Sequence, residues 1–501
     1  MRSPINRREF LSAALVGLGR KTDPPIAGGF VNEDWVRGHQ LRDRAAFPRA
    51  TFPRATRQIK IPIVIVGGGI AGLSAAWRLD KRGVRDFVVI EMASQAGGNS
   101  RSGENKISAY PWGAHYVPVP NRGAALVREL FEDLGLLRAG IWDERSLCHS
   151  PQERLFLHGR WQEDIEPAVG ATLRDREQRK RFQDKVDRFR ATGEFTIPME
   201  TGARPSPLDS LSMKEWMKQQ GFDSPYLNWY VDYACRDDYG ARANDTSAWA
   251  AIHYFASREH DDKGPLTWPE GNGWIVNKLL AKLSKYVRTN AMVHRVSPEG
   301  RGWRVLAGDT QYIADSVIFA APTFLAPYII EGAEASYGIE YSPWLTANLT
   351  IERAPTENGF EMAWDNTIYD SPALGYVVAT HQSLRMHIEQ SVWTYYWSLA
   401  DGTPAANRKL LLEKDWQFWK EAILHDLLRA HPDIRQCVSR IDIMRMGHAM
   451  ARPVPGFLKS RTKLPSMRNL FFANSDLSGF SIFEEAQYRG VRAADRAMNR
   501  K

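Results

Sequence analysis

The sequence lacks the features of several common protein classes. No apolar run approaches the roughly 18 residues that a bilayer-spanning helix needs, so we expect no such helix. Only three cysteines are present, Cys148, Cys235 and Cys437, and their wide separation makes neither a Cys-x-x-Cys motif nor a disulfide framework. There is no His-Glu-x-x-His motif, no Cys/His cluster and no Gly-x-Ser-x-Gly turn. We therefore expect no bound metal and exclude a zinc protease and a serine hydrolase.

The positive charge is confined to one end of the chain. The net charge is +8, and residues 1–60 alone hold twelve basic and five acidic residues, a difference of +7. The rest is close to neutral, so we expect no nucleic-acid partner. With 501 residues the chain is long enough for two sizeable cores.

The basic end begins with a pattern typical of export. Arg7 and Arg8 precede a Phe-Leu pair and a short apolar stretch, so residues 1–19 resemble a twin-arginine signal. This route carries folded cargo, which suits a protein that folds around a cofactor. We expect periplasmic localisation through the twin-arginine machinery, with a cytoplasmic basic tail as the alternative. Residues 20–58 are rich in Pro, Gly and Arg and predict an extended basic linker.

A glycine-rich turn follows this linker. Residues 61–66 are mostly β-branched and predict a buried strand, and residues 73–79 have helical character. Between them, Gly67, Gly69 and Gly72 form Gly-x-Gly-x-x-Gly. The first glycine permits the tight turn, the second lets the backbone approach a pyrophosphate, and the third lets helix pack on strand. The helix N-terminus then offers free N–H groups to phosphates.

A second strand completes the nucleotide motif. Residues 87–90 predict a strand that ends in Glu91, nineteen positions after Gly72. An acidic side chain there is expected to bind ribose hydroxyls, and it disfavours the 2′-phosphate of NADP. Strand, turn, helix, strand and acid in this order predict a Rossmann-like fold.

Gly97, Gly98 and Asn99 follow shortly after Glu91. Together with the glycine turn they resemble the flavin amine oxidase and phytoene desaturase superfamily, in which a Gly-Gly element lies along FAD. Further segments resemble the family in its order: residues 112–117, 121–136, 268–274, 292–296, 316–322, 469–476 and 485–494.

The resemblance implies a non-covalent FAD, since no cysteine lies after residue 469. The residues that it assigns to the cofactor are Gly67, Gly68, Gly69, Ala71, Gly72, Glu91, Gly97, Gly98, Asn99, Val293, Asp476 and Ala486.

The resemblance also implies the fold class, α/β with an α+β second domain. A Rossmann-like FAD-binding domain would be discontinuous, and a mixed substrate domain would cap the flavin. The predicted FAD-binding segments are 59–118, 266–332 and 466–501, and the predicted substrate segments are 119–265, mainly helical, and 333–465. In the last segment, the pattern predicts one helix over 410–428 and a strand over 392–399.

The implied reaction passes a hydride equivalent from a small organic substrate, an amine or polyamine in the favoured case, to flavin. Oxygen or another acceptor would then take the electrons. Two departures from the amine oxidases keep other readings open: the strand 345–351 has no lysine where many members have one, and Ile482 stands where many have tyrosine. The alternatives are an FAD-dependent carbon–carbon desaturase or isomerase, and a flavin-fold binding protein without turnover.

Four residues are candidates for the catalytic groups. His448 and His115 could handle protons, because imidazole titrates near neutrality. Tyr395 could line the substrate pocket, and Asn348 is the polar residue nearest to the missing lysine.

Overall fold

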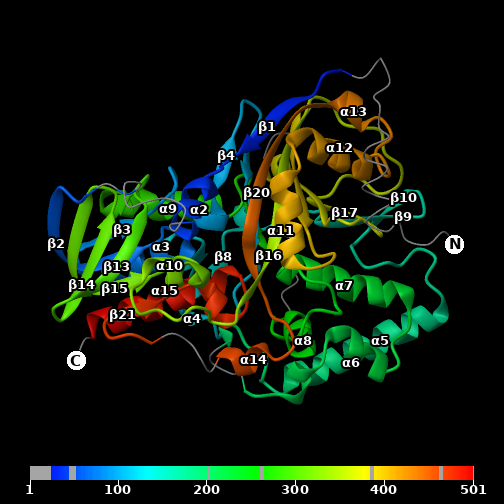
Figure 1. Ribbon diagram of the computed structural model, residues 1–501. Helices are drawn as coiled ribbons and strands as arrows, with labels where there is room; N and C mark the ends of the chain where they lie inside the picture. Colours follow the sequence, from blue (N-terminus) through cyan, green and yellow to red (C-terminus); the bar gives the residue numbers. More distant parts are fainter. Residues whose placement is uncertain are drawn as a thin grey trace.

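The computed structural model describes residues 24–43, 52, 54–199, 204–259, 264–383, 389–461 and 466–499. Two large sheets dominate it. In Figure 1 a seven-stranded sheet lies to the left and an eight-stranded sheet to the right, with a group of helices below the second sheet. The predicted export signal lies outside the described residues. Among the described helices, none has the length and apolar character that crossing a bilayer requires.

The seven-stranded sheet has a Rossmann-like centre. Parallel pairing joins β12, β3, β2, β15 and β21, and the antiparallel strands β14 and β13 extend one edge. The strands are β2 (Arg57–Val66), β3 (Phe87–Ile90), β12 (Val287–Arg288), β13 (Val293–Glu299), β14 (Gly302–Ala307), β15 (Thr310–Phe319) and β21 (Leu470–Phe472). The end of β2 is buried on both faces, as its continuous β-branched run predicts. The mixed α/β fold class is confirmed.

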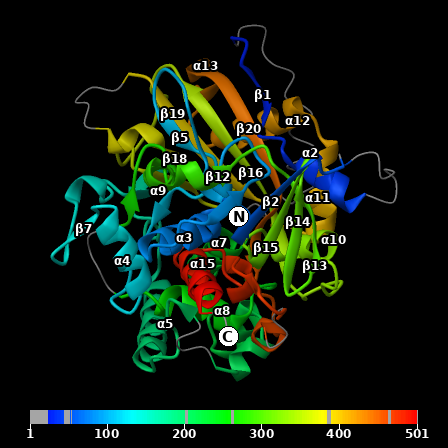
Figure 2. The same cartoon turned by 90° about the vertical axis from the view of Figure 1, so that its left-hand side faces the viewer.

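Two helices far apart in the sequence pack against each other beside this sheet. α3 (Ile70–Lys81) follows β2, and α15 (Phe483–Met498) is the last helix of the chain. Figure 2 shows them side by side. Their backbones approach closely at Gly490, where a Cβ atom would lie 2.1 Å from the carbonyl oxygen of Ala71. Because residue 490 has no side chain, α15 can pack directly on the first turn of α3, which follows the glycine turn.

The eight-stranded sheet has the order β1-β20-β16-β19-β18-β17-β9-β10. Its strands are β1 (Ala27–Val31), β9 (Glu153–Leu157), β10 (Arg160–Glu163), β16 (Glu340–Ile351), β17 (Asp365–Ile368), β18 (Gly375–Val378), β19 (Ser391–Ser398) and β20 (Val438–Arg452). Alternate residues of β16, such as Leu345 and Leu349, pack with Trp419 and Ile423 in one core cluster. Strand β19 agrees with the prediction for residues 392–399.

The remaining helices cover the sheets or connect them. They are α2 (Trp35–Arg42), α4 (Ala125–Asp133), α5 (Leu173–Ala191), α6 (Met213–Gln219), α7 (Pro225–Tyr239), α8 (Ala248–Ala256), α9 (Gly273–Leu283), α10 (Ala326–Ile329), α11 (Pro404–Glu413), α12 (Trp416–Leu427), α13 (Ile434–Cys437) and α14 (Phe457–Ser460). Helices α5 to α8 form the group below the eight-stranded sheet (Figure 1). Short pairs of strands are β4 (Ser102–Glu104) with β5 (Ala109–Pro111), β6 (Tyr116–Val117) with β11 (Leu266–Thr267), and β7 (Leu137–Arg138) with β8 (Ile141–Trp142).

The prediction of an extended linker over residues 20–58 is wrong for its described part. β1 pairs in parallel with β20, α2 follows it, and residues 57 and 58 already belong to β2. Arg445 holds this segment, because its guanidinium lies 3.7 Å from the ring centroid of Phe30 and pairs with Glu33. The partners that order the segment are hundreds of positions away in the sequence.

Two further predictions need correction. The single helix expected over residues 410–428 is broken into α11 and α12, because the Asp415 carboxylate accepts the Phe418 N–H and starts a new helix. The mainly helical segment 119–265 also contributes β9 and β10 to the eight-stranded sheet.

Candidate active site

A cavity of about 300 Å³ opens where parallel strands of the seven-stranded sheet end; we call it the cofactor cavity. Val66, Ile90 and Ala320, at or just beyond the ends of β2, β3 and β15, line it. The carboxyl edge of a parallel sheet is where dinucleotides bind in Rossmann-like folds. Most residues predicted to hold the cofactor lie on its wall: Gly67, Gly69, Ala71, Glu91, Gly97, Gly98, Asn99, Val293, Asp476 and Ala486.

The three motif glycines have different surroundings. Gly67 has φ +101°, and a Cβ there would lie 2.8 Å from the Ala321 nitrogen. At Gly72 a Cβ would lie 1.9 Å from the Gly67 oxygen, so this glycine, which is not on the cavity wall, serves packing. A Cβ at Gly69 would lie 3.9 Å from its nearest neighbour, the Cα of Gly98. The space beside Gly69 is therefore open to the cavity.

Helix α3 begins at this open glycine. Gly69 is its N-cap and makes no side-chain cap, so the amide groups of the first turn are offered to a ligand. Open space, free N–H groups and the positive end of a helix suit an anionic pyrophosphate. The residues present fit a dinucleotide.

Glu91 follows β3 and has a fixed orientation. Its two carboxylate oxygens accept the backbone N–H groups of Gly68 at 2.7 Å and Ala93 at 2.8 Å. Burial raises the pKa of Glu91, while these two hydrogen bonds act in the opposite direction. Gly68 thus supports the carboxylate that would bind ribose, although Gly68 itself does not line the cavity.

Asp476 closes another part of the wall. Its carboxylate accepts the N–H of Thr323 at 2.7 Å, the hydroxyl of Thr323 at 2.6 Å and the hydroxyl of Tyr341 at 2.7 Å. Burial raises the pKa of Asp476, and the bonds from Thr323 and Tyr341 lower it. These bonds join the C-terminal segment to the loop after β15 and to the start of β16.

His448 is the one catalytic candidate that lines the cofactor cavity. Its ring stacks on Phe324 with 4.3 Å between centroids. Burial lowers the pKa of His448 to about 4, and nearby positive charge acts in the same direction. The imidazole is therefore neutral near pH 7, and its site disfavours the protonated form.

The structure does not bring Tyr395 and Asn348 to this cavity. The Tyr395 hydroxyl donates to Asp426 at 2.8 Å on the far face of the sheet. Asn348 donates to the Pro111 carbonyl at 3.0 Å and accepts from Thr394 at 2.7 Å. Both side chains bind within the protein, which contradicts a direct catalytic role for either.

His115 lies in an aromatic stack beside a second cavity. Its ring centroid is 4.6 Å from that of Tyr396, 4.9 Å from that of Tyr116 and 5.5 Å from that of Trp364. Burial lowers the pKa of His115 to about 4. Tyr116 and Trp364 line that second cavity whereas His115 does not, so His115 is placed to position aromatic rings.

This second cavity, which we call the acidic chamber, has a volume of about 440 Å³. Ile482, just before α15, lines both the chamber and the cofactor cavity, so the two spaces adjoin. Aromatic side chains on the chamber wall are Tyr116, Tyr230, Tyr233, Tyr254, Phe255, Trp364 and Phe480. Carboxyl groups on the same wall are Glu153, Asp237, Asp238, Glu259 and Asp365.

Four of the chamber carboxyls have raised pKa values. Burial and neighbouring carboxylates raise the pKa of Asp237 to about 7 and that of Glu153 to about 7. Burial raises the pKa of Asp238 to about 6, and the pKa of Asp365 lies well above its usual value. The folded state holds these protons more tightly than the unfolded state, so stability falls as pH rises from the usual carboxyl range through about 7. Carboxyls kept at such a cost to stability, on the wall of a cavity, make the chamber a candidate functional site.

Sequence reasoning missed this chamber. Its signal would have been the Asp237-Asp238 pair near the end of a helix rich in aromatic residues. The other carboxyls come from strands far away in the sequence.

Comparison with known proteins gives the fold. A family model described as an NAD(P)-binding Rossmann-like domain matches residues 65–134. No curated protein matches the chain in sequence.

Solved structures resemble almost the whole chain. Wild-type putrescine oxidase bound to putrescine is 18% identical, with a TM-score of 0.69 over 88% of this chain and 100% of that chain. Cyclohexylamine oxidase from Brevibacterium oxydans IH-35A is 14% identical, with a TM-score of 0.65 over 87% of this chain and 98% of that chain. A CLA-producing fatty acid isomerase from P. acnes is 15% identical, with a TM-score of 0.61 over 87% and 98%. At these identities the likeness establishes the fold.

Proposed function

From the fold that the chain shares with these structures, we propose that it is an FAD-dependent oxidoreductase that oxidises an organic amine. The observation that carries the proposal is the junction at Ile482, where a cavity suited to a dinucleotide adjoins a chamber lined by carboxyls and aromatic rings. Carboxylates attract ammonium groups, and aromatic faces bind both cations and methylene chains.

The cofactor-binding roles follow from the geometry. The first turn of α3 would bind the pyrophosphate, and Glu91 would bind the ribose. Bound FAD supplies the acceptor for the hydride equivalent. None of the three cysteines is on the described wall of the cofactor cavity, which supports non-covalent binding.

The remaining roles belong to the chamber. Its carboxyls attract and orient the amine, and its aromatic side chains exclude water around the reacting carbon. His448 is neutral near pH 7 and would contact the cofactor as an uncharged hydrogen-bonding group on the cavity wall. Oxygen or another acceptor then takes the electrons.

A carbon–carbon desaturase or isomerase is the second reading, and the fatty acid isomerase shares the fold. Such substrates are apolar and would need an apolar tunnel. Five carboxyls on the chamber wall oppose a fatty chain, because each unpaired carboxylate would lose its water without compensation. The chamber therefore favours an amine.

Anaerobic mixing with amines tests the proposal. We expect primary amines and polyamines to bleach the absorbance of the oxidised flavin, while unsaturated fatty acids leave it unchanged. Admitting the electron acceptor should restore the yellow colour. A flavin that stays oxidised with every amine would contradict amine oxidation and favour a binding protein without turnover.

A further inference from the structure

Two of the chamber carboxyls project from neighbouring strands. β9 and β17 pair in parallel with Glu153 opposite Asp365. Residues opposite each other in a sheet present their side chains on the same face. The pKa of each group is raised partly by neighbouring carboxylates, Glu153 being one of those that act on Asp365.

Helix α7 supplies the third carboxyl. Tyr230, Tyr233 and Asp237 follow one another at spacings of three and four residues, so they share one face of the helix. All three line the chamber. Burial, Glu153 and Asp237 together raise the pKa of Asp365. The Asp237 and Asp365 carboxyls therefore lie close enough to interact electrostatically. We call Glu153, Asp237 and Asp365 the carboxyl triad.

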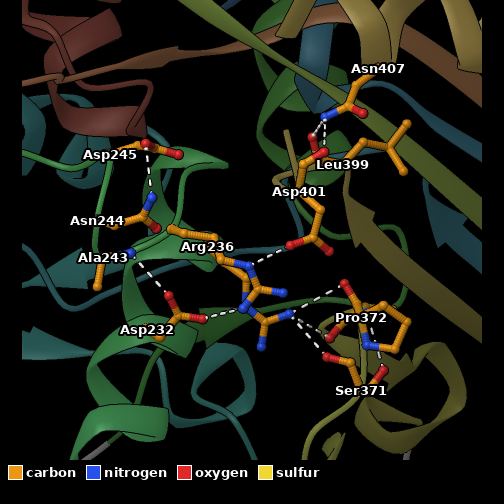
Figure 3. A network of polar contacts seen from close by, with 12 residues as sticks. Asp232, Arg236, Ala243, Asn244, Asp245, Ser371, Pro372, Leu399, Asp401 and Asn407 are labelled. Atoms are coloured by element: carbon orange, nitrogen blue, oxygen red, sulfur yellow. Dashed lines mark hydrogen bonds and ion pairs between the residues drawn. The ribbon is translucent and has the colours of Figure 1, made fainter. Parts of the chain in front are cut away.

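The adjacent Arg236 does not pair with the triad. Its guanidinium donates to the carbonyls of Ser371, Pro372 and Ala373 at 3.1 to 3.3 Å and lies 3.4 Å from Asp232 (Figure 3). Asp232 also pairs with Arg242 at 2.6 Å. The two arginines, Asp232 and the three carbonyl groups therefore form one network. This network fixes α7 against the sheet and binds the Arg236 guanidinium outside the chamber wall, although its charge still lowers the pKa of Asp237 in part.

The arginines on the chamber wall, Arg179, Arg190 and Arg258, have other partners. Arg258 pairs with Glu484, and its charge lowers the pKa of Asp238 rather than that of a triad member. Arg179 pairs with Glu166 at 2.6 Å, and Arg190 pairs with Asp187. In the part of the chain that the structure describes, no ion pair joins a Lys or Arg to the triad. The three carboxyls thus face the chamber without a direct ion pair to a cation of the described residues.

We propose that the carboxyl triad binds the second ammonium group of an aliphatic diamine or polyamine, whose first amine extends past Ile482 to the cofactor cavity. This inference rests on the proposed function and names the substrate class of the same site. The ammonium would replace the missing cation, and the aromatic side chains of Tyr116, Tyr254 and Trp364 would cover the methylene chain. An amine with one positive charge would leave the triad unpaired.

Isothermal titration of the flavin-loaded protein with putrescine and n-butylamine tests this pairing. The two ligands have the same carbon chain and differ in the second ammonium group. Wild-type protein should bind putrescine at least about tenfold more tightly, as expected for a charge-assisted contact. Asp237→Asn should reduce that ratio severalfold, and Asp365→Asn should do the same.

Glu163→Gln is the matched control. Glu163 is exposed on β10, beside β9, and does not line the chamber. This variant should keep the wild-type ratio. The Asn variants should melt no lower than the wild type at neutral pH, because each removes a buried carboxyl without a cation partner.

The outcomes separate the two proposals. Equal affinities for both ligands in wild-type protein would overturn the role of the triad. An affinity ratio that stays unchanged in both Asn variants would do the same. In either case amine oxidation would still stand if n-butylamine bleaches the flavin. A selective, Asp237-dependent binding of putrescine without bleaching would support the triad and contradict the proposed oxidation.

Discussion

Gly69→Val should abolish flavin binding while leaving the fold intact. A Cβ at Gly69 meets only one atom, 3.9 Å away, and the extra methyl groups would extend into the cofactor cavity beside the first turn of α3. The valine would occupy the space that we assign to the pyrophosphate. We expect FAD affinity to fall by on the order of 100-fold or more, because close backbone approach to the phosphates is lost. Titration of the apoprotein with FAD, followed by flavin fluorescence, measures it.

Two other glycines make the test specific. Gly123→Val, at an exposed position with open space around it, should leave FAD affinity and melting temperature unchanged. Gly72→Val should lower the melting temperature, because its Cβ would lie 1.9 Å from the Gly67 oxygen. A Gly69→Val protein that folds and binds FAD as tightly as wild type would show that the ligand lies elsewhere.

Gly490→Ala should destabilise the protein although it adds only one methyl group to a helix. Alanine favours helices over glycine, so helix propensity alone predicts a gain in stability. The new Cβ, however, would lie 2.1 Å from the Ala71 carbonyl oxygen, and the backbones of α3 and α15 would have to move apart. We expect a loss of about 3 kcal/mol in the free energy of unfolding, as is common for overpacking.

The control for this substitution is Gly38→Ala in α2, where no atom lies within 4 Å of the added Cβ. This change should stabilise the protein by about 0.4–1 kcal/mol or leave it unchanged. Denaturant unfolding of both variants gives the two free energies. A Gly490→Ala protein as stable as Gly38→Ala would show that α3 and α15 are not in close backbone contact.

The nucleotide-binding half of the site was predictable because its signals are local. Gly67, Gly69, Gly72 and Glu91 lie within one strand-helix-strand unit. Backbone geometry requires glycine at positions 67 and 72, whereas Gly69 and Glu91 suit a dinucleotide. The C-terminal part followed from the resemblance, and the structure brings Asp476 and Ala486 to the same cavity.

The substrate half was not predictable in the same way. Glu153, Asp237 and Asp365 belong to three elements, and only the pairing of β9 with β17 and the packing of α7 bring them together. Each carboxylate alone resembles a surface residue. The same holds for β1, whose Ala-Gly-Gly-Phe-Val sequence has little strand character and whose partner β20 lies about four hundred positions away.

Tyr395 failed as a catalytic candidate because strand register decides its orientation. Its side chain packs in the core on the far face of the sheet, where Asp426 accepts its hydroxyl. Asn348 lies opposite Thr394 on the other face, and its amide is bound by Thr394 and Pro111. Alternation along a strand sends successive residues to opposite faces, so a shift by one position separates a pocket residue from a core residue. Tyr396, the neighbour of Tyr395, stacks on His115 beside the chamber.

The central claim is that one FAD lies between the glycine turn after β2 and the start of α15. The most direct measurement is to purify the protein, denature it and identify the released cofactor by chromatography and absorbance. We predict a yellow protein that releases FAD in a one-to-one ratio with the chain, or an apoprotein that takes up FAD to that ratio. A folded protein that is colourless and takes up no FAD would contradict the account.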